Sequence, residues 1–318
     1  MKGKKTKFAD DGWALWIDGD ERSTIYLNEW INPKGKNYVD VSIRVYGAKE
    51  TKIVNLFIPF AIERNELCDM SYTLADSPAL RALFNTNAKV DSEKMKYTSE
   101  LSYDNRTVSL LNLTDEYTTL KSVAYGTVFS VDFNFIKDCI TSDEAYMIFR
   151  IPHKTLDEIF SPSRSDKGII DRLNSLIQSP IVSEKYGYSI RINEARLLPP
   201  EINEIETLQE QRIRKALVTI SLDDEYMMNE SACYRIRRLE AELNRNYAPE
   251  GYDCSNAINY QWVNERDVNM KAHYNFYFTM EHNKISKSSM FFYLLIVLMI
   301  GVMDATLYDL FKLIFGLF

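Results

Sequence analysis

Residues 290–318 read MFFYLLIVLMIGVMDATLYDLFKLIFGLF, and this stretch decides how the rest of the chain is organised. None of residues 290–303 carries a charge. A helix over residues 290–308 would rise about 28 Å, close to the roughly 30 Å hydrocarbon core of a bilayer. The stretch therefore predicts one C-terminal transmembrane helix, with the preceding residues forming a head outside the membrane.

The composition of that head is typical of a globular protein. The chain has 318 residues, of which 46% are hydrophobic and 13% aromatic, enough to bury sizeable cores. Its net charge of −7 argues against unspecific coating of nucleic acid, because phosphate binding relies on Lys and Arg. The cysteines are few and widely spaced, which is typical of isolated thiols in a reducing compartment.

The charges around the membrane segment predict its orientation. The N-terminus has no apolar region and no cleavage site of the signal-peptide kind, so we expect that the head is not secreted. Lys284 and Lys287 lie on the head side of the segment, and basic residues accumulate on the cytoplasmic side of membranes. The sequence therefore predicts a single-pass protein of the inner (plasma) membrane with a cytoplasmic head.

Short strands dominate the first half of the chain. In YVDVSIRVY, residues 38–46, Val39, Val41 and Ile43 alternate with Asp40 and Ser42, which is the period of a strand with one face toward solvent. Other strand-like runs occupy residues 14–18, 24–30, 53–60, 106–113, 126–136 and 145–152. We expect a mainly β (α+β) head built as an antiparallel β-sandwich or a barrel-like sheet.

A polar segment, SPSRSDKG at residues 161–168, contains Pro and Gly and predicts a linker. It would separate a β-rich, sandwich-like domain at 1–160 from a second α+β unit at 169–283, which leads into the membrane segment at 284–318. The head therefore has two expected units.

The second unit contains one strong helical pattern. Ala232, Ile236, Leu239 and Leu243 recur at helical spacing, which predicts a helix over residues 231–247. Strands are expected at 188–192 and 272–280, whereas residues 202–222 fit either a helix or a strand.

Sequence motifs for catalysis and for phosphate loops are missing from the chain. His153 follows Pro152 at the end of a predicted strand, where we interpret it as facing solvent. The acidic run DGDE at 18–21 lacks the further ligands of an EF-hand loop, so an acidic turn is the simpler interpretation. We expect no catalytic residue, no metal and no cofactor, with a scattered catalytic site around His153 as the alternative.

Basic residues of the second unit are the candidate ligand-binding residues, together with one tyrosine. Guanidinium groups match phosphate oxygens and tyrosine rings stack on bases, so the expected ligand is a nucleotide or a short single-stranded oligonucleotide. On the predicted helix Arg235, Arg238 and Arg245 would share one face. The alternative is a solvated helix face. The candidates are Arg212, Arg214, Lys215, Arg235, Arg238, Arg245 and Tyr247.

The second half of the tail carries a polar stripe. As one helix, it places Gly301, Asp304, Tyr308 and Lys312 along one side, and these are the candidate pore-lining residues. An Asp at mid-membrane costs about 2.5–3.5 kcal/mol on insertion scales and usually faces a partner or water. Several copies could turn this face inward around a pore. Alternatively, a break near Asp304 could lay residues 309–318 in the interface, or Asp304 could lie near the far headgroups of a plain anchor.

The β-rich head, the segment at 284–318 and Asp304 within it together give an organisation that resembles the membrane effectors of bacterial anti-phage defence, such as Hailong-type effector channels. The resemblance covers architecture. It implies a cytosolic sensing domain that controls a transmembrane pore in response to a nucleotide or oligonucleotide signal.

The favoured function is thus a non-enzymatic, homo-oligomeric, gated ion channel or pore whose expected partners are membrane lipid, other copies of the chain and a small anionic ligand. The alternative is a membrane-tethered scaffold that recruits a cognate cytosolic partner.

Overall fold

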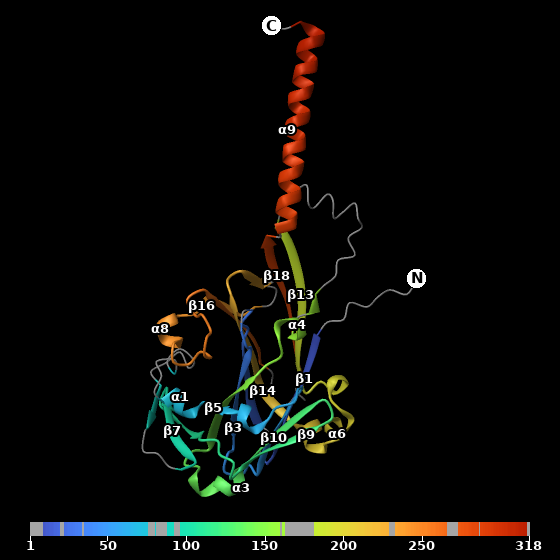
Figure 1. Ribbon diagram of the computed structural model, residues 1–318. Coiled ribbons are helices and arrows are strands. Elements are labelled where there is room, and N and C mark those ends of the chain that lie inside the picture. The colour runs from blue at the N-terminus through green and yellow to red at the C-terminus, as the bar shows by residue number, and fades with distance from the viewer. Residues whose placement is uncertain are drawn as a thin grey trace.

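The computed structural model describes residues 9–19, 22–33, 35–75, 80, 88–91, 96–159, 161–162, 181–228, 233–265, 273–285 and 287–316. These residues form a β-rich head from which one long helix projects (Figure 1).

An eight-stranded sheet forms one layer of the head. Its strand order is β15-β18-β13-β1-β4-β10-β9, with β12 paired to β13. The strands are β1 (Ala9–Asp18), β4 (Ile53–Ile58), β9 (Thr118–Val123), β10 (Gly126–Asp132), β12 (Ser161–Pro162), β13 (Ile181–Ile192), β15 (Tyr226–Met228) and β18 (Tyr274–Ile285).

A ten-stranded sheet forms the other layer. Its order is β16-β17-β14-β2-β3-β11-β8-β7-β6, with β5 paired to β11. The strands are β2 (Arg22–Trp30), β3 (Tyr38–Tyr46), β5 (Cys68–Asp69), β6 (Lys89–Asp91), β7 (Thr98–Tyr103), β8 (Arg106–Leu111), β11 (Glu144–Pro152), β14 (Arg212–Asp223), β16 (Arg235–Arg238) and β17 (Ala257–Glu265).

The main core lies between these two sheets, because each contributes its alternate apolar side chains to one cluster. Phe129 of β10 meets Phe149 of β11 with ring centroids 4.7 Å apart, and Trp262 of β17 meets Phe278 of β18 at 4.3 Å. These contacts join one sheet to the other, so the predicted mainly β, sandwich-like head is confirmed.

Strand pairing differs from the expected antiparallel meander in three places. The pairs β1–β13, β2–β14 and β8–β11 are parallel. Two of them join strands on opposite sides of the predicted linker, so residues before and after 161–168 share both sheets and one core. Within the predicted linker, Ser161–Pro162 forms β12, and residues 163–168 lie outside the described part of the chain.

The predicted helix over 231–247 is wrong. Its described residues form the edge strand β16, which pairs with β17, and then the short helix α8 (Ala241–Asn244). Hydrogen bonds to the edge of β17 stabilise residues 235–238 as a strand more than helix propensity would stabilise them as a helix. Ile236, which the prediction placed on the buried face of the helix, is 42% exposed. The ambiguous residues 202–222 divide into a short helix and the strand β14.

Short helices connect the strands around the head. They are η1 (Arg64–Glu66), α1 (Ser71–Ala75), α3 (Phe133–Ile136), η2 (Lys137–Cys139), α4 (Leu156–Ile159), η3 (Ala195–Leu197), α6 (Pro200–Asn203) and α7 (Glu206–Glu210). The long C-terminal helix α9 (Lys287–Phe315) follows β18 and points away from both sheets (Figure 1).

Candidate functional site

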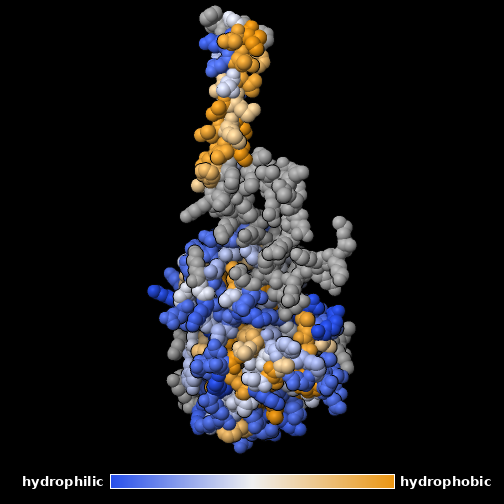
Figure 2. All heavy atoms as spheres, turned by 45° about the vertical axis from the view of Figure 1, so that its right-hand side comes forward, coloured by the Kyte–Doolittle hydropathy of each residue, from blue (hydrophilic) through white to orange (hydrophobic). Residues whose placement is uncertain are grey.

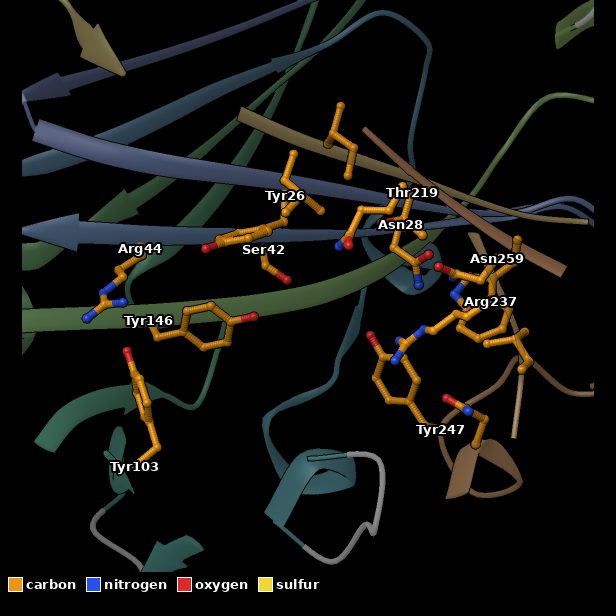
Figure 3. A pocket seen from close by; sticks show the side chains of 16 residues that line it. Tyr26, Asn28, Ser42, Arg44, Tyr103, Tyr146, Thr219, Arg237, Tyr247 and Asn259 are labelled. Atoms are coloured by element: carbon orange, nitrogen blue, oxygen red, sulfur yellow. The ribbon is translucent and has the colours of Figure 1, made fainter. Parts of the chain in front are cut away.

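A cavity of about 280 Å³ lies on the outer face of the ten-stranded sheet (Figure 3). Strand alternation places its side chains: on β2, Ile25 points into the core, whereas Tyr26, Asn28 and Trp30 face the cavity. The lining is aromatic (Tyr26, Trp30, Tyr103, Tyr146, Tyr247), amide (Asn28, Asn244, Asn259, Gln261), basic (Arg44, Arg237), hydroxyl (Ser42, Thr219) and aliphatic (Leu27, Leu217, Leu239). Although the chain has a net charge of −7, no carboxylate is among these residues.

Arg44 and Tyr103 lie at one end of the cavity, where the charge of Arg44 is already neutralised. Its guanidinium is paired with Glu144, with Nε 2.8 Å from Oε2, and lies over the rings of Tyr46 and Tyr103 at 5.2 and 5.6 Å. A ligand at this end would therefore contact aromatic rings and an already paired guanidinium, not an unpaired positive charge.

Arg237 lies at the opposite end and extends toward Tyr247, with Asn259 nearby (Figure 3). Its strand β16 pairs with β17 in the register Arg237↔Asn259, which brings these two side chains together. Burial and the neighbouring Arg235 lower the pKa of Arg237, against the opposing charge of Glu240. Within the part of the chain that the structure describes, Arg237 forms no ion pair.

Two tyrosines and one amide supply polar atoms between these ends. Burial raises the pKa of Tyr26 to about 12 and also raises that of Tyr146, so both hydroxyls stay protonated at neutral pH. The Oδ1 atom of Asn28 is buried and accepts no hydrogen bond from any described residue. A buried acceptor without a donor is costly, so this atom favours a bound group that donates a hydrogen bond.

A buried ion pair lies beneath the Arg237 end. Arg150 Nε lies 2.5 Å from Asp40 Oδ1, and Arg150 Nη2 lies 2.9 Å from Asp40 Oδ2 and 2.7 Å from the carbonyl oxygen of Tyr247. Trp30 Nε1 donates to the same carboxylate at 2.7 Å. Burial lowers the pKa of Arg150, but Asp40 outweighs this effect and the net pKa is raised. The pair holds Trp30 and Tyr247 in place, so this wall of the cavity is preorganised.

Of the seven predicted ligand-binding residues, the structure brings only Tyr247 into this cavity. The others are dispersed. Arg212 and Arg235 are exposed, and Arg214 lies over the Tyr46 ring at 5.9 Å. Lys215 pairs with Glu265 and Arg238 with Asp224, each at 3.6 Å. Arg245 lines a separate surface hollow beyond α8.

The common face expected for Arg235, Arg238 and Arg245 does not exist, because Arg235–Arg238 is a strand. In a strand, alternate residues share a face, so Arg235 and Arg237 point one way and Arg238 points the other. The prediction of a helix therefore left out Arg237. If residues 235–238 are taken as a strand, whose alternate residues share a face, Arg237 groups with Arg235.

The tail is a second candidate site. Within α9, the 22 residues Tyr293–Ile314 have a mean hydropathy of 2.0 and are long and apolar enough to cross a membrane. Figure 2 shows hydrophobic side chains along most of this helix and hydrophilic ones near its far end. The predicted stripe of Gly301, Asp304, Tyr308 and Lys312 is exposed throughout. Helix α9 is continuous over Lys287–Phe315, so the helix break considered near Asp304 is not present.

The tail is joined to the head through a long strand ladder. Strand β18 pairs with β13 from Ile192↔Tyr274 to Ile181↔Ile285, and α9 begins at Lys287. Only residue 286 separates the paired strand from the helix.

His153 belongs to a buried polar network instead of facing solvent. Its Nε2 lies 3.5 Å from Glu29 Oε1, and both side chains are fully buried. The Tyr188 hydroxyl lies 2.7 Å from the same Glu29 oxygen and 3.2 Å from Asp11, and burial raises the pKa of Tyr188. Because these residues come from β1, β2, β13 and the end of β11, the network ties the two sheets together.

The chain matches no protein-family model and no curated protein. Among solved structures it is similar to the Fcho1 mu homology domain of Danio rerio with a bound Eps15 peptide, at 6% sequence identity, with 87% of this chain and 80% of that chain covered and a TM-score of 0.16. A TM-score of this size is too low to indicate a shared fold.

Proposed function

We propose that this protein is a homo-oligomeric membrane effector whose C-terminal helices assemble into a pore gated by the β-rich head. The observation that carries the proposal is the place of Asp304 in α9. It lies eleven residues after Tyr293 and ten before Ile314, which puts it roughly 15 Å from either end of the span.

Asp304 has no counter-charge within reach on its own helix. The positions three and four residues away, where helix neighbours meet, hold Ile300, Gly301, Leu307 and Tyr308. A lone Asp at this depth costs about 2.5–3.5 kcal/mol on insertion scales. The carboxyl group therefore has to contact water or another copy of the helix. A ring of tails around a water-filled pore provides both contacts.

The other charged residues of the tail do not need such an explanation. Asp309 and Lys312 are three residues apart, which places them side by side on the helix. Lys312 is also close enough to Ile314, the end of the span, for its long side chain to reach the interface. Asp304 alone calls for a partner outside its helix.

Gly301 supports helix assembly on the same face. A Cβ atom added at Gly301 would meet nothing within 4 Å, so nothing in its own chain requires a glycine there. Small residues let neighbouring transmembrane helices approach closely, and Ala305 follows four residues later in the same small-xxx-small spacing. At about 100° per residue both small residues lie together beside Asp304, as expected for a face that packs against identical helices.

In this proposal the head lies in the cytoplasm beside the inner membrane, an orientation that Lys284 and Lys287 on the head side of the segment favour. The short connection from β18 to α9 supports control of the tail by the head, since only one residue lies between the paired strand and the helix. A role in anti-phage defence, as in the effector channels that this architecture resembles, is part of the proposal.

Planar-bilayer recording with the purified full chain tests the proposal. We expect discrete currents from the unaltered protein and none from Asp304→Leu, because the substitution removes the charged group that keeps the helix interface wet. The variant should still insert, since it makes the tail more apolar.

Val302→Leu is the matched control, because it lies at the same depth on the opposite side of the helix and should leave the current unchanged. Currents that persist in Asp304→Leu would refute the assigned pore lining. A monomer in detergent that gives no current would refute the pore itself.

A membrane-tethered scaffold is the second candidate. The strand β16 favours it, since among the described strands it ends the ten-stranded sheet, and Tyr234 just before it and Ile236 within it are exposed. This function predicts no current from the unaltered protein, so the same recording separates the two candidates.

A further inference from the structure

We propose that the cavity on the outer face of the ten-stranded sheet binds one nucleoside monophosphate per chain, with the phosphate at Arg237 and the base among the tyrosines and amides. Binding itself does not depend on the tail, whereas the role of this ligand as a gating signal rests on the proposed function.

The size of the cavity limits the ligand to a single unit. Its volume of about 280 Å³ falls just below the range of roughly 300–1,000 Å³ found for sites of drug-sized molecules. One base with its sugar and phosphate matches this volume more closely than a chain of nucleotides does. The site therefore selects a mononucleotide, not the oligonucleotide that a long basic surface would hold.

The charges around the cavity favour an anion. Among the described lining residues none is acidic, whereas Arg44 and Arg237 are basic. Arg44 is neutralised by Glu144, whereas Arg237 is half-buried and has no ion pair with any described residue. A partly buried guanidinium gains most from an anion that accepts two of its hydrogen bonds, and phosphate has that geometry.

The remaining lining favours a planar heteroaromatic ring. Tyr26, Tyr146 and Tyr247 present rings on which a base can stack. The unpartnered Oδ1 of Asn28 needs a donor, such as an exocyclic amine or a ring N–H. Asn259 donates from Nδ2 to Ser221 Oγ at 3.1 Å, which leaves its carbonyl oxygen as a further acceptor beside Arg237. Stacking surfaces combined with amide acceptors match a base better than they match a carboxylic acid or a bare sugar.

Two routes lead from this cavity toward the tail. Strand β14, which supplies Leu217 and Thr219 to the lining, continues through a tight turn into β15 of the other sheet, and β15 pairs with β18. Tyr226 at the start of β15 stacks on His282 of β18 at 4.2 Å. On β17, Trp262 follows the lining residue Gln261 and contacts Phe278 of β18. Both routes end on the strand that becomes α9.

Isothermal titration calorimetry on the full chain in detergent tests the site. The probes are the four ribonucleoside 5′-monophosphates, the matching nucleosides, ribose 5-phosphate and inorganic phosphate. We expect one equivalent of at least one monophosphate to bind, and to bind more tightly than its nucleoside, ribose 5-phosphate or inorganic phosphate.

Arg237→Gln is expected to weaken binding of that monophosphate by about tenfold or more, the effect of one lost charge-assisted contact, and to leave nucleoside binding unchanged. Arg237→Lys keeps a cation and should lose less. Arg238→Gln is the matched control, because Arg238 is on the same strand but points to the other face, and it should leave both affinities unchanged. Thermal melting without ligand shows whether each variant is folded.

The proposal is overturned if no monophosphate binds, if ribose 5-phosphate or inorganic phosphate binds as tightly, or if a folded Arg237→Gln variant binds as the unaltered protein does. Its failure is distinguishable from failure of the pore. Current without nucleotide binding would overturn only the ligand assignment, and nucleotide binding without current would overturn only the pore.

Discussion

Asp40 connects the cavity on the outer face of the ten-stranded sheet to the strands beneath it. Its carboxylate accepts hydrogen bonds from Arg150 and from Trp30, and the carboxylate is 1% exposed. Asp40 lies on the face of β3 that the alternation in residues 38–46 predicts to be wet, yet Asp40 and Ser42 are both buried. A second layer covers this face, formed by residues such as Leu239 and Tyr247 that are distant in the sequence. Alternation predicts the two faces of a strand but not whether a further layer covers one of them.

Asp40→Asn is expected to lower the free energy of unfolding by about 3–5 kcal/mol, because it leaves the Arg150 guanidinium buried without a counter-charge. Chemical denaturation of the protein measures the change. Asp224→Asn serves as the control, since its pair with Arg238 is exposed and should contribute less than about 1 kcal/mol. A loss for Asp40→Asn as small as that of the control would show that this pair does not stabilise the fold.

At the scale of elements, whether an edge segment forms a strand or a helix decides which of its side chains line the cavity. Residues 235–238 illustrate this, because the same four residues place Arg238 with Arg235 on a helix but Arg237 with Arg235 on a strand. The long, alternating strands such as β3 were predictable, since their pattern is local. Strand β16 was not, because it exists only through its pairing with β17.

The pairing of β10 with β4 depends on close approach of their backbones at Gly126. A Cβ atom at this position would lie 2.2 Å from the carbonyl oxygen of Ile58 and 2.7 Å from the Phe57 ring. Gly126→Ala is therefore expected to destabilise the head by about 1–3 kcal/mol, as overpacking does elsewhere, measured by thermal or chemical unfolding.

Ser122→Ala in the neighbouring strand β9 is the control, because Ser122 is exposed and its loss should change stability by less than about 0.5 kcal/mol. Unchanged stability of Gly126→Ala would mean that the two strands separate at this end with little cost.

At the scale of the whole molecule, the head and the tail are connected through strand β18. Strand β18 is paired with β13 up to Ile285, and the helix begins at Lys287. If the head gates a pore, this connection has to transmit its movement.

Insertion of four Gly and Ser residues after Ile285 is expected to change the open probability of the pore several-fold and to leave the single-channel conductance unchanged, because a flexible linker uncouples the head without altering the helices. Single-channel recording measures both quantities. The same insertion between Asp104 and Asn105, in the exposed turn between β7 and β8, should affect neither. An open probability that is insensitive to the linker would show that the head does not act through this connection.

The sequence by itself determined the features that depend on local pattern. These are the apolar C-terminal helix, predicted over 290–308, its polar stripe around Asp304, and the strands whose apolar residues alternate, because hydrophobic periodicity records which face of each element is buried. Only the tertiary structure decided which strands pair. Parallel pairing of β1 with β13 and of β2 with β14 unites the two predicted units, and the edge of β17 converts an expected helix into β16. The cavity with Asn28, Arg237 and Asn259 arises from that pairing, since hydrogen bonds between distant strands leave no period in the sequence of either one.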